Sequence, residues 1–111
     1  MSNLTDFFED TTKEFNITVY YDDVAQNITG DVVTLYIKQN PDDTNANATI
    51  TKAADVTTSG ATGIAIFALT PTETAKAVGA YYYEITWTLS TGKHFVIDNG
   101  VVNIKNKLVD N

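Results

Sequence analysis

The sequence contains no cysteine and no arginine, and each absence removes a class of function. Without cysteine the chain has no disulfide, no thiolate nucleophile and no cysteine-ligated zinc site. Seven lysines stand against fourteen acidic residues, which gives a net charge of −7 at pH 7. Proteins that bind nucleic acid neutralise phosphates with cationic side chains and read bases with arginine. We therefore expect neither nucleic acid nor an anionic membrane surface as a partner.

Long apolar runs are also missing. No stretch approaches the roughly 20 apolar residues that a membrane-spanning helix needs. The N-terminal residues are acidic and lack the basic start and apolar centre of a signal peptide, so we expect no export by the ordinary route. With 111 residues, of which 43% are hydrophobic, the chain can bury one core. We expect one domain over residues 15–111.

Residues 1–14 differ in pattern from the rest of the chain. Leu4, Phe7, Phe8 and Phe15 lie at helical spacings. One interpretation is a frayed tail or a short packed turn. The other is an N-terminal arm whose Phe7 and Phe8 dock on a neighbouring subunit, in which case deletion of residues 1–13 would leave the fold intact and weaken assembly.

From residue 15 onward, strand patterns return at roughly the 8–12-residue spacing of a β-sandwich. The clearest covers residues 80–89, where aromatic and β-branched residues alternate with polar ones. This alternation predicts that Tyr81, Tyr83 and Trp87 face the core. Residues 64–69 are apolar on both faces and predict a central strand, whereas 49–52 predict an edge strand. The expected strands are 15–21, 32–38, 49–52, 64–69, 80–89, 93–98 and 101–108.

Two local signals punctuate these strands. Thr70 and Glu73 form a capping box around Pro71, which predicts a short helix through Val78 that Gly79 ends. The dipeptide at 99–100, Asn-Gly, predicts a type I′ hairpin turn. Together the patterns predict an all-β fold. We expect an immunoglobulin-like antiparallel β-sandwich of about seven strands with one short helical turn near residues 71–78.

Candidate catalytic and metal-binding residues are few. His94 is the only histidine and has no serine or acid at a motif spacing. The acid pairs at 22–23 and 42–43 lie in predicted turns, where aspartate commonly caps backbone amides, and the alternating ligand pattern of an EF-hand is absent. We expect no enzyme activity, no catalytic residue, no bound metal and no cofactor.

Some aromatic residues fall on polar strand faces and are candidates for contact with a partner. Tyr36 and Tyr82 lie on such faces, and Glu84 shares the face of Tyr82. With Phe7 and Phe8 they form our set of expected partner contacts. An alternative is a carbohydrate-binding or adhesion module that would use Tyr82, Tyr36 and the polar loop Gln39–Asn47.

Several short motifs follow one another along most of the chain. They are Asn27-Ile-Thr-Gly30, Val33-Thr-Leu35-Tyr-Ile37-Lys38, Gly63-x-Ala65-x-Phe67-x-Leu69-Thr-Pro71-x-x-Thr74, Gly79-x-Tyr81-x-Tyr83-Glu-Ile85, Gly92 and Asn99-Gly100-Val-Val-Asn-Ile104. In this order, over roughly residues 17–109, the chain resembles small virion proteins of tailed bacteriophages and the N-terminal domain of siphophage upper-baseplate proteins. Each motif is an instruction for folding, so the resemblance bears on function by association only.

The resemblance implies a structural protein of a tailed phage, assembled in the bacterial cytoplasm and located in the virion. Such domains serve in head decoration, in the neck, or as baseplate and tail adaptors. They contact other virion proteins and are normally homo-oligomers on a symmetric particle. Unlike the baseplate proteins, this sequence has no long fibre region after Val109. That difference favours a decoration or adaptor protein.

Overall fold

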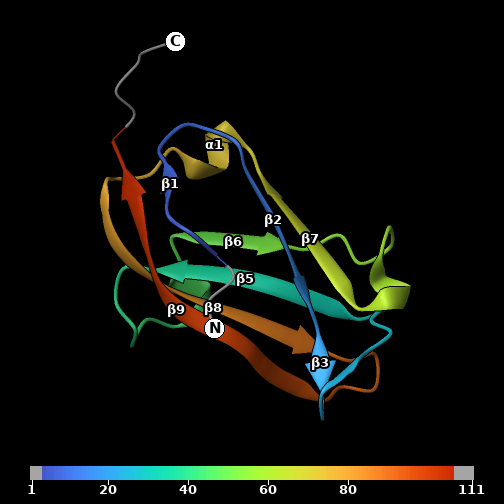
Figure 1. Ribbon diagram of the computed structural model, residues 1–111. Helices are drawn as coiled ribbons and strands as arrows, with labels where there is room; N and C mark the ends of the chain where they lie inside the picture. Colours follow the sequence, from blue (N-terminus) through green and yellow to red (C-terminus); the bar gives the residue numbers. More distant parts are fainter. Residues whose placement is uncertain (1–3, 107–111) are drawn as a thin grey trace.

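Two β-sheets face each other in the computed structural model, which describes residues 4–106 (Figure 1). The larger sheet has the strand order β1-β9-β8-β5-β6, and the smaller one pairs β2 with β7. The expected all-β sandwich is confirmed. The strands of the larger sheet are β1 (Phe7–Phe8), β9 (His94–Lys105), β8 (Gly79–Thr88), β5 (Val32–Lys38) and β6 (Ile50–Ala53). The other elements are β2 (Lys13–Thr18), β7 (Ile64–Leu69), the small hairpin β3 (Tyr20–Tyr21) and β4 (Val24–Ala25), the helix α1 (Pro71–Thr74) and the 3-10 turns η1 (Asn45–Asn47) and η2 (Gly60–Thr62).

The core lies between the two sheets and is built by alternation along the strands. Tyr81, Tyr83 and Trp87 of β8 are at most 4% exposed, as their spacing predicts. In the smaller sheet, Phe67 of β7 is fully buried against the core. The centre of its ring lies 4.9 Å from the centre of the Phe15 ring, and the two rings are stacked. Each buried ring of β8 also satisfies its polar atom. The three bonds are Tyr81 Oη to the carbonyl of Ala77 (2.6 Å), Tyr83 Oη to Asp98 (3.0 Å) and Trp87 Nε1 to Asp31 (3.0 Å).

The predicted hairpin turn at 99–100 is wrong. β9 continues straight through both residues because Asn99 pairs with Glu84 and Gly100 pairs with Tyr83 across to β8. A long antiparallel ladder outweighs the local turn preference of an Asn-Gly pair. The register shifts once along this ladder, between Ile85 and Thr86, where β9 carries a bulge. The last two residues of the expected strand 101–108 lie outside the described residues.

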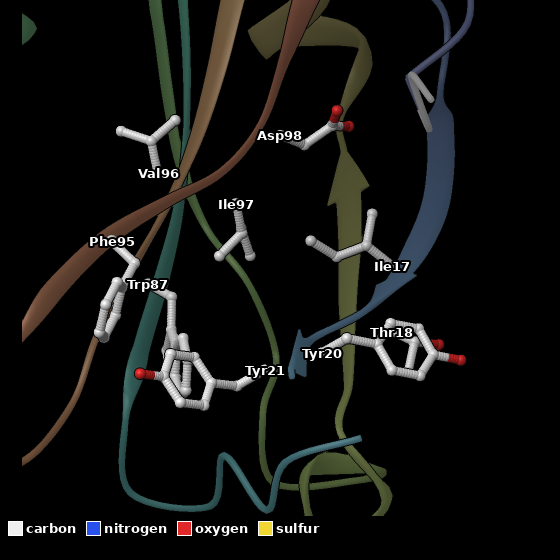
Figure 2. A pocket seen from close by; sticks show the side chains of 9 residues that line it. All are labelled: Ile17, Thr18, Tyr20, Tyr21, Trp87, Phe95, Val96, Ile97 and Asp98. Atoms are coloured by element: carbon white, nitrogen blue, oxygen red, sulfur yellow. The ribbon is translucent and has the colours of Figure 1, made fainter. Parts of the chain in front are cut away.

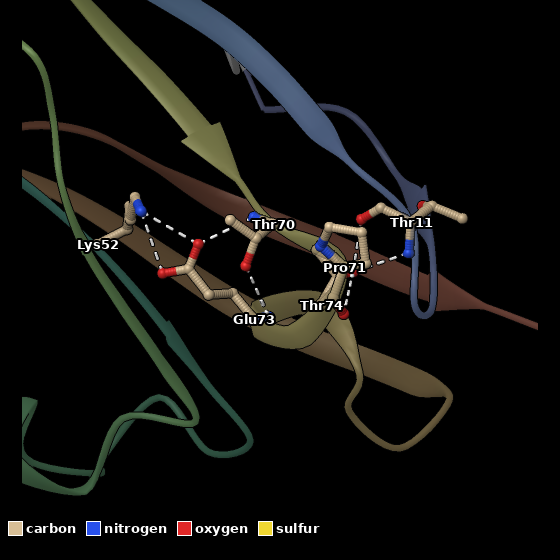
Figure 3. A network of polar contacts seen from close by, with 6 residues as sticks. All are labelled: Thr11, Lys52, Thr70, Pro71, Glu73 and Thr74. Atoms are coloured by element: carbon tan, nitrogen blue, oxygen red, sulfur yellow. Dashed lines mark hydrogen bonds and ion pairs between the residues drawn. The ribbon is translucent and has the colours of Figure 1, made fainter.

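The helix is shorter than predicted. The capping box at Thr70 and Glu73 is present, with Pro71 at the first position, but α1 ends at Thr74 (Figure 3). Its C-cap residue Ala75 turns out of helical geometry, and Gly79 lies inside β8 rather than capping a helix. Between α1 and β8, the carbonyl of Ala77 accepts a hydrogen bond from the hydroxyl of the buried Tyr81 at 2.6 Å. This tertiary contact competes with continuation of the helix.

β6 lies at a sheet edge as expected, whereas two other predicted strands differ from expectation. β7, predicted to be central, pairs fully with β2 on one side and meets Asp55 through a single bridge at Ile66 on the other. Ala68 is exposed on its outer face. The expected strand over 15–21 is interrupted at Val19, whose N–H and carbonyl bond to Gly63 and Gln26.

The N-terminal segment belongs to the domain. Leu4 and Phe7 are 3% and 4% exposed, and β1 pairs in parallel with β9, with Phe7 opposite Ile104. The helical spacing is therefore misleading, because the segment forms a strand. Phe7 is a core residue and is not available to a neighbouring subunit, which corrects its place among the expected contacts. The buried hydroxyl of Thr74 fastens the next turn by donating to the carbonyl of Thr11 at 2.6 Å and accepting from its N–H at 3.0 Å (Figure 3).

A network at Asp55 predicts how stability depends on pH. Its backbone bridges to Ile66 of β7, and its carboxylate accepts four hydrogen bonds from Thr57 and Thr58. The hydroxyl of Thr58 is the largest influence, and with the N–H and hydroxyl of Thr57 it lowers the pKa of Asp55 far below its usual value. Because the pKa is lowered in the folded state, this stabilisation is present above about pH 4 and is lost as the pH falls.

We therefore expect the urea midpoint to fall on acidification below about pH 4, and to fall less steeply in Asp55→Asn than in the wild type. The matched control is Asp42→Asn in an exposed loop, which should keep the wild-type slope. An unchanged slope in Asp55→Asn would show that the network has no part in acid sensitivity.

Candidate functional site

Among residues 4–106, His94 and the acidic residues do not gather into a metal-binding cluster. His94 lies at an exposed end of the β8–β9 pair, with Nδ1 2.7 Å from Thr88 Oγ1. His94 pairs with Thr88 of β8, which is six residues along that strand from Tyr82, so the side chains of His94 and Tyr82 do not meet. Between residues 4 and 106 there is no group of three or more His, Cys, Asp or Glu that could hold a metal ion. Over the same range, no helix has the length and apolar character to cross a membrane.

Three of the expected contact residues come together on the outer face of the larger sheet. Tyr36 of β5 is opposite Glu84 of β8, and the next outward pair is Lys38 with Tyr82. Phe8 lies apart from them on β1 and is 48% exposed. The structure therefore groups Tyr36, Tyr82 and Glu84 but leaves Phe8 as an isolated exposed ring.

A hollow of about 280 Å³, which we call the sheet-face hollow, lies beside these residues. Lys38 lines it, is only 9% exposed and has its Nζ 6.0 Å from the centre of the Tyr36 ring. No ion pair links Lys38 to Glu84 in the part of the chain that is described. Sequence reasoning missed Lys38, although its position two residues after Tyr36 places both on one strand face. The side chains around the hollow are Lys38, Pro41, Tyr82, Tyr83, Glu84, Asn99 and Val101.

A larger groove of about 520 Å³ opens between the two sheets, where β2 and β9 pass each other (Figure 2). We call it the β2–β9 seam. Ile17 and Thr18 of β2 form one wall, and Ile97 and Asp98 of β9 form the other. Figure 2 shows the side chains of both walls, with the tyrosines of β3 at one end of the groove. The full lining is Ile17, Thr18, Tyr20, Tyr21, Trp87, Phe95, Val96, Ile97 and Asp98.

Aromatic rings line one end of the seam. The centre of the Phe95 ring lies 5.4 Å from that of Trp87 and 5.8 Å from that of Tyr21. Tyr20 and Tyr21 are 61% and 52% exposed. Alternation along the expected strand 15–21 predicts that Tyr21 faces inward. This is wrong because β2 ends before Val19 and Tyr21 is exposed. Two tyrosines directly before the Asp22-Asp23 turn were the sequence signal that could have indicated exposed rings here.

Both walls of the seam are strand edges. β9 pairs with β8 along its length, and its other side meets β1 only at Ile104 and Lys105. Among the described strands, β2 pairs only with β7. Within residues 4–106, no strand occupies the side of β9 that faces the seam over residues 94–102. An uncovered strand edge is a template for pairing with another chain, and proteins normally blunt it with lysine, proline or a covering segment.

No model of a protein family matches the sequence, and neither curated proteins nor solved structures give a match. The likeness to phage virion proteins therefore depends on the motifs of the sequence alone.

Proposed function

We propose that this protein is a structural component of a tailed-phage particle that acts by binding other proteins. Its place would be in head decoration, in the neck, or as a baseplate or tail adaptor. The observation that carries the proposal is the β2–β9 seam, where two strand edges without a partner strand among residues 4–106 border a groove with an aromatic end. Open strand edges and exposed apolar side chains are typical of surfaces where proteins pair.

The sheet face and Phe8 offer further contact surfaces to such an assembly. Phe8, Tyr82, Val96 and Val101 are each more than 40% exposed although they are large and apolar. On a symmetric particle, several copies of one small domain bind through repeated surfaces, so we propose a homo-oligomeric arrangement. The net charge of −7 keeps the free chain soluble until it meets its neighbours.

Mass spectrometry of tailed particles tests this function directly. Particles would be purified on a density gradient from the organism that encodes the chain. We expect the chain to copurify with capsid and tail proteins at a fixed stoichiometry that washing with 1 M salt does not change. Particles with full infectivity that contain none of the chain would contradict the proposal.

The sheet-face hollow favours a second candidate, a carbohydrate-binding module. Tyr82 gives it a half-exposed ring on which a sugar can stack, and Lys38, Glu84 and Asn99 surround that ring with hydrogen-bonding groups. Sugar sites use this combination of flat aromatic surface and polar side chains.

A glycan array followed by calorimetry of the hits separates the two candidates. If the hollow binds sugar, Tyr82→Ala should abolish binding. The control variant Phe8→Ala removes a similarly exposed ring outside the hollow and should bind sugar as the wild type does. No binding to any glycan, or equal loss in both variants, would rule out the hollow as a sugar site.

A further inference from the structure

The β2–β9 seam has the geometry to accept an extended segment from another protein. We propose that the occupant is a β-strand of a different polypeptide that alternates apolar with lysine or arginine residues and pairs with the open edge of β9. This inference rests on the proposed function and names the partner chemistry of the same site. Addition of a strand to an open edge is a common mode of peptide recognition, in which backbone bonds give affinity and alternate side chains give specificity.

Hydrogen bonds at the end of β9 show which backbone groups face the seam. The N–H of Asn103 donates to Asp6 Oδ1 at 2.9 Å, and the carbonyl of Lys105 accepts from the N–H of Glu9 at 2.9 Å. These bonds lie on the side of β9 away from β8. Because successive residues of a strand direct their N–H and C=O to opposite sides, Asn99 and Val101 point theirs to the same open side.

The lining of the seam selects for apolar residues on one face of the incoming strand. Its walls carry Ile17 and Ile97, and Phe95 with Trp87 forms its aromatic end. Val96 is 52% exposed at its rim. Side chains that alternate along a docked strand would place every second residue in this apolar groove.

The charge of the seam determines which polar side chains the incoming strand should carry. Among the described residues, the one charged side chain that lines the seam is Asp98, and none of the lysines in that range lines it. Asp22 and Asp23 follow Tyr21 directly at the turn into β4. A strand with basic side chains therefore meets complementary charge at the seam. A second copy of this chain, with its net charge of −7, meets repulsion there, so copies on one particle would contact each other through the sheet face and Phe8 instead.

A displayed peptide library tests the chemistry of the occupant. Random segments of about ten residues, the upper length of an ordinary strand, would be selected on yeast against the purified chain. We expect enrichment of alternating apolar and basic residues. Selected peptides should change the fluorescence of Trp87, the single tryptophan, and shift the amide resonances of β9 at residues 94–101. Enrichment of acidic or non-alternating segments, or no binder, would overturn the proposal.

Substitution of one backbone donor tests the pairing itself. Val101→Pro removes an N–H that points away from β8, and proline is tolerated at strand edges. We expect it to weaken peptide binding at least about tenfold. Val101→Thr keeps the N–H and should bind as the wild type does. Equal affinity in both variants would contradict pairing with β9.

A second variant covers the case in which Val101→Pro does not fold. Asp98→Asn keeps an oxygen that can accept from Tyr83 but removes the charge. We expect about tenfold weaker binding of basic peptides, and no change would overturn the charge argument.

A wild-type dimer that Val101→Pro dissociates would instead show that a second copy occupies the seam. Peptide binding by a chain that is absent from particles would refute the phage function while the seam inference stands.

Discussion

Replacing Phe7 with alanine is expected to destabilise the protein by about 3–5 kcal/mol, the range for truncation of a buried phenylalanine. The Phe7 side chain is 4% exposed and lies in the core beside β9. Because domains of this size are stable by only about 5–15 kcal/mol, the variant should lose a fifth or more of its stability. Urea unfolding, followed by the fluorescence of Trp87 and by circular dichroism, measures the difference.

The neighbouring ring supplies the matched control. Phe8 has the same side chain one position later in the same strand, but it is 48% exposed. Phe8→Ala should therefore cost less than about 1 kcal/mol. A loss in Phe7→Ala that is as small as that in Phe8→Ala would mean that the N-terminal segment is a dispensable arm and that β1 is not part of the core.

The second large effect is expected at Gly63, which links η2 to β7. Its φ of +88° is in the left-handed region, and a Cβ built there would lie 2.8 Å from the backbone carbonyl oxygen of Gln26. The carbonyl of Gly63 also accepts from the N–H of Val19 at 2.8 Å, so the backbone has little freedom to move. We expect Gly63→Ala to cost about 3 kcal/mol, from backbone strain and the contact together.

Gly30 separates these two contributions. Its φ of +87° is nearly identical, but a Cβ there would meet no atom within 4 Å. Gly30→Ala should therefore cost only the conformational strain of about 1–2 kcal/mol. Thermal unfolding of both variants measures the difference, and equal losses would show that the close approach to Gln26 is not a constraint.

Alternation along the sequence predicted the parts of the fold that depend on local pattern. The inward rings of β8 follow directly from period-two spacing, and the capping box of α1 follows from four consecutive residues. The grouping of Tyr36 with Glu84 could not be read from the sequence, because it depends on the register between β5 and β8.

The errors occur where distant parts of the chain compete with a local signal. The Asn-Gly pair at 99–100 favours a turn, but pairing with β8 on both sides of it keeps β9 extended. Likewise, Leu4, Phe7 and Phe8 lie at helical spacings but form no helix, because Phe7 and Phe8 pair in parallel with β9. Neither competitor is visible within a short window of sequence.

The seam was not predicted because it is defined by what does not pair. Which edges of β2 and β9 remain open depends on the whole strand order. The structure also changes the view of how subunits could meet. Phe7 lies in the core of its own chain, so an N-terminal arm that uses Phe7 does not explain assembly. We propose the open edge of β9 as the assembly surface for a different polypeptide.

Amide hydrogen exchange at the open edge of β9 shows whether another strand pairs there when the chain is assembled. The N–H groups of Asn99 and Val101 would be followed in the free chain and in the chain bound within purified particles. We predict fast exchange in the free chain and strong protection in the particle, with the β8 amides protected in both. Equal exchange at Asn99 and Val101 in the two states would contradict assembly through the β2–β9 seam.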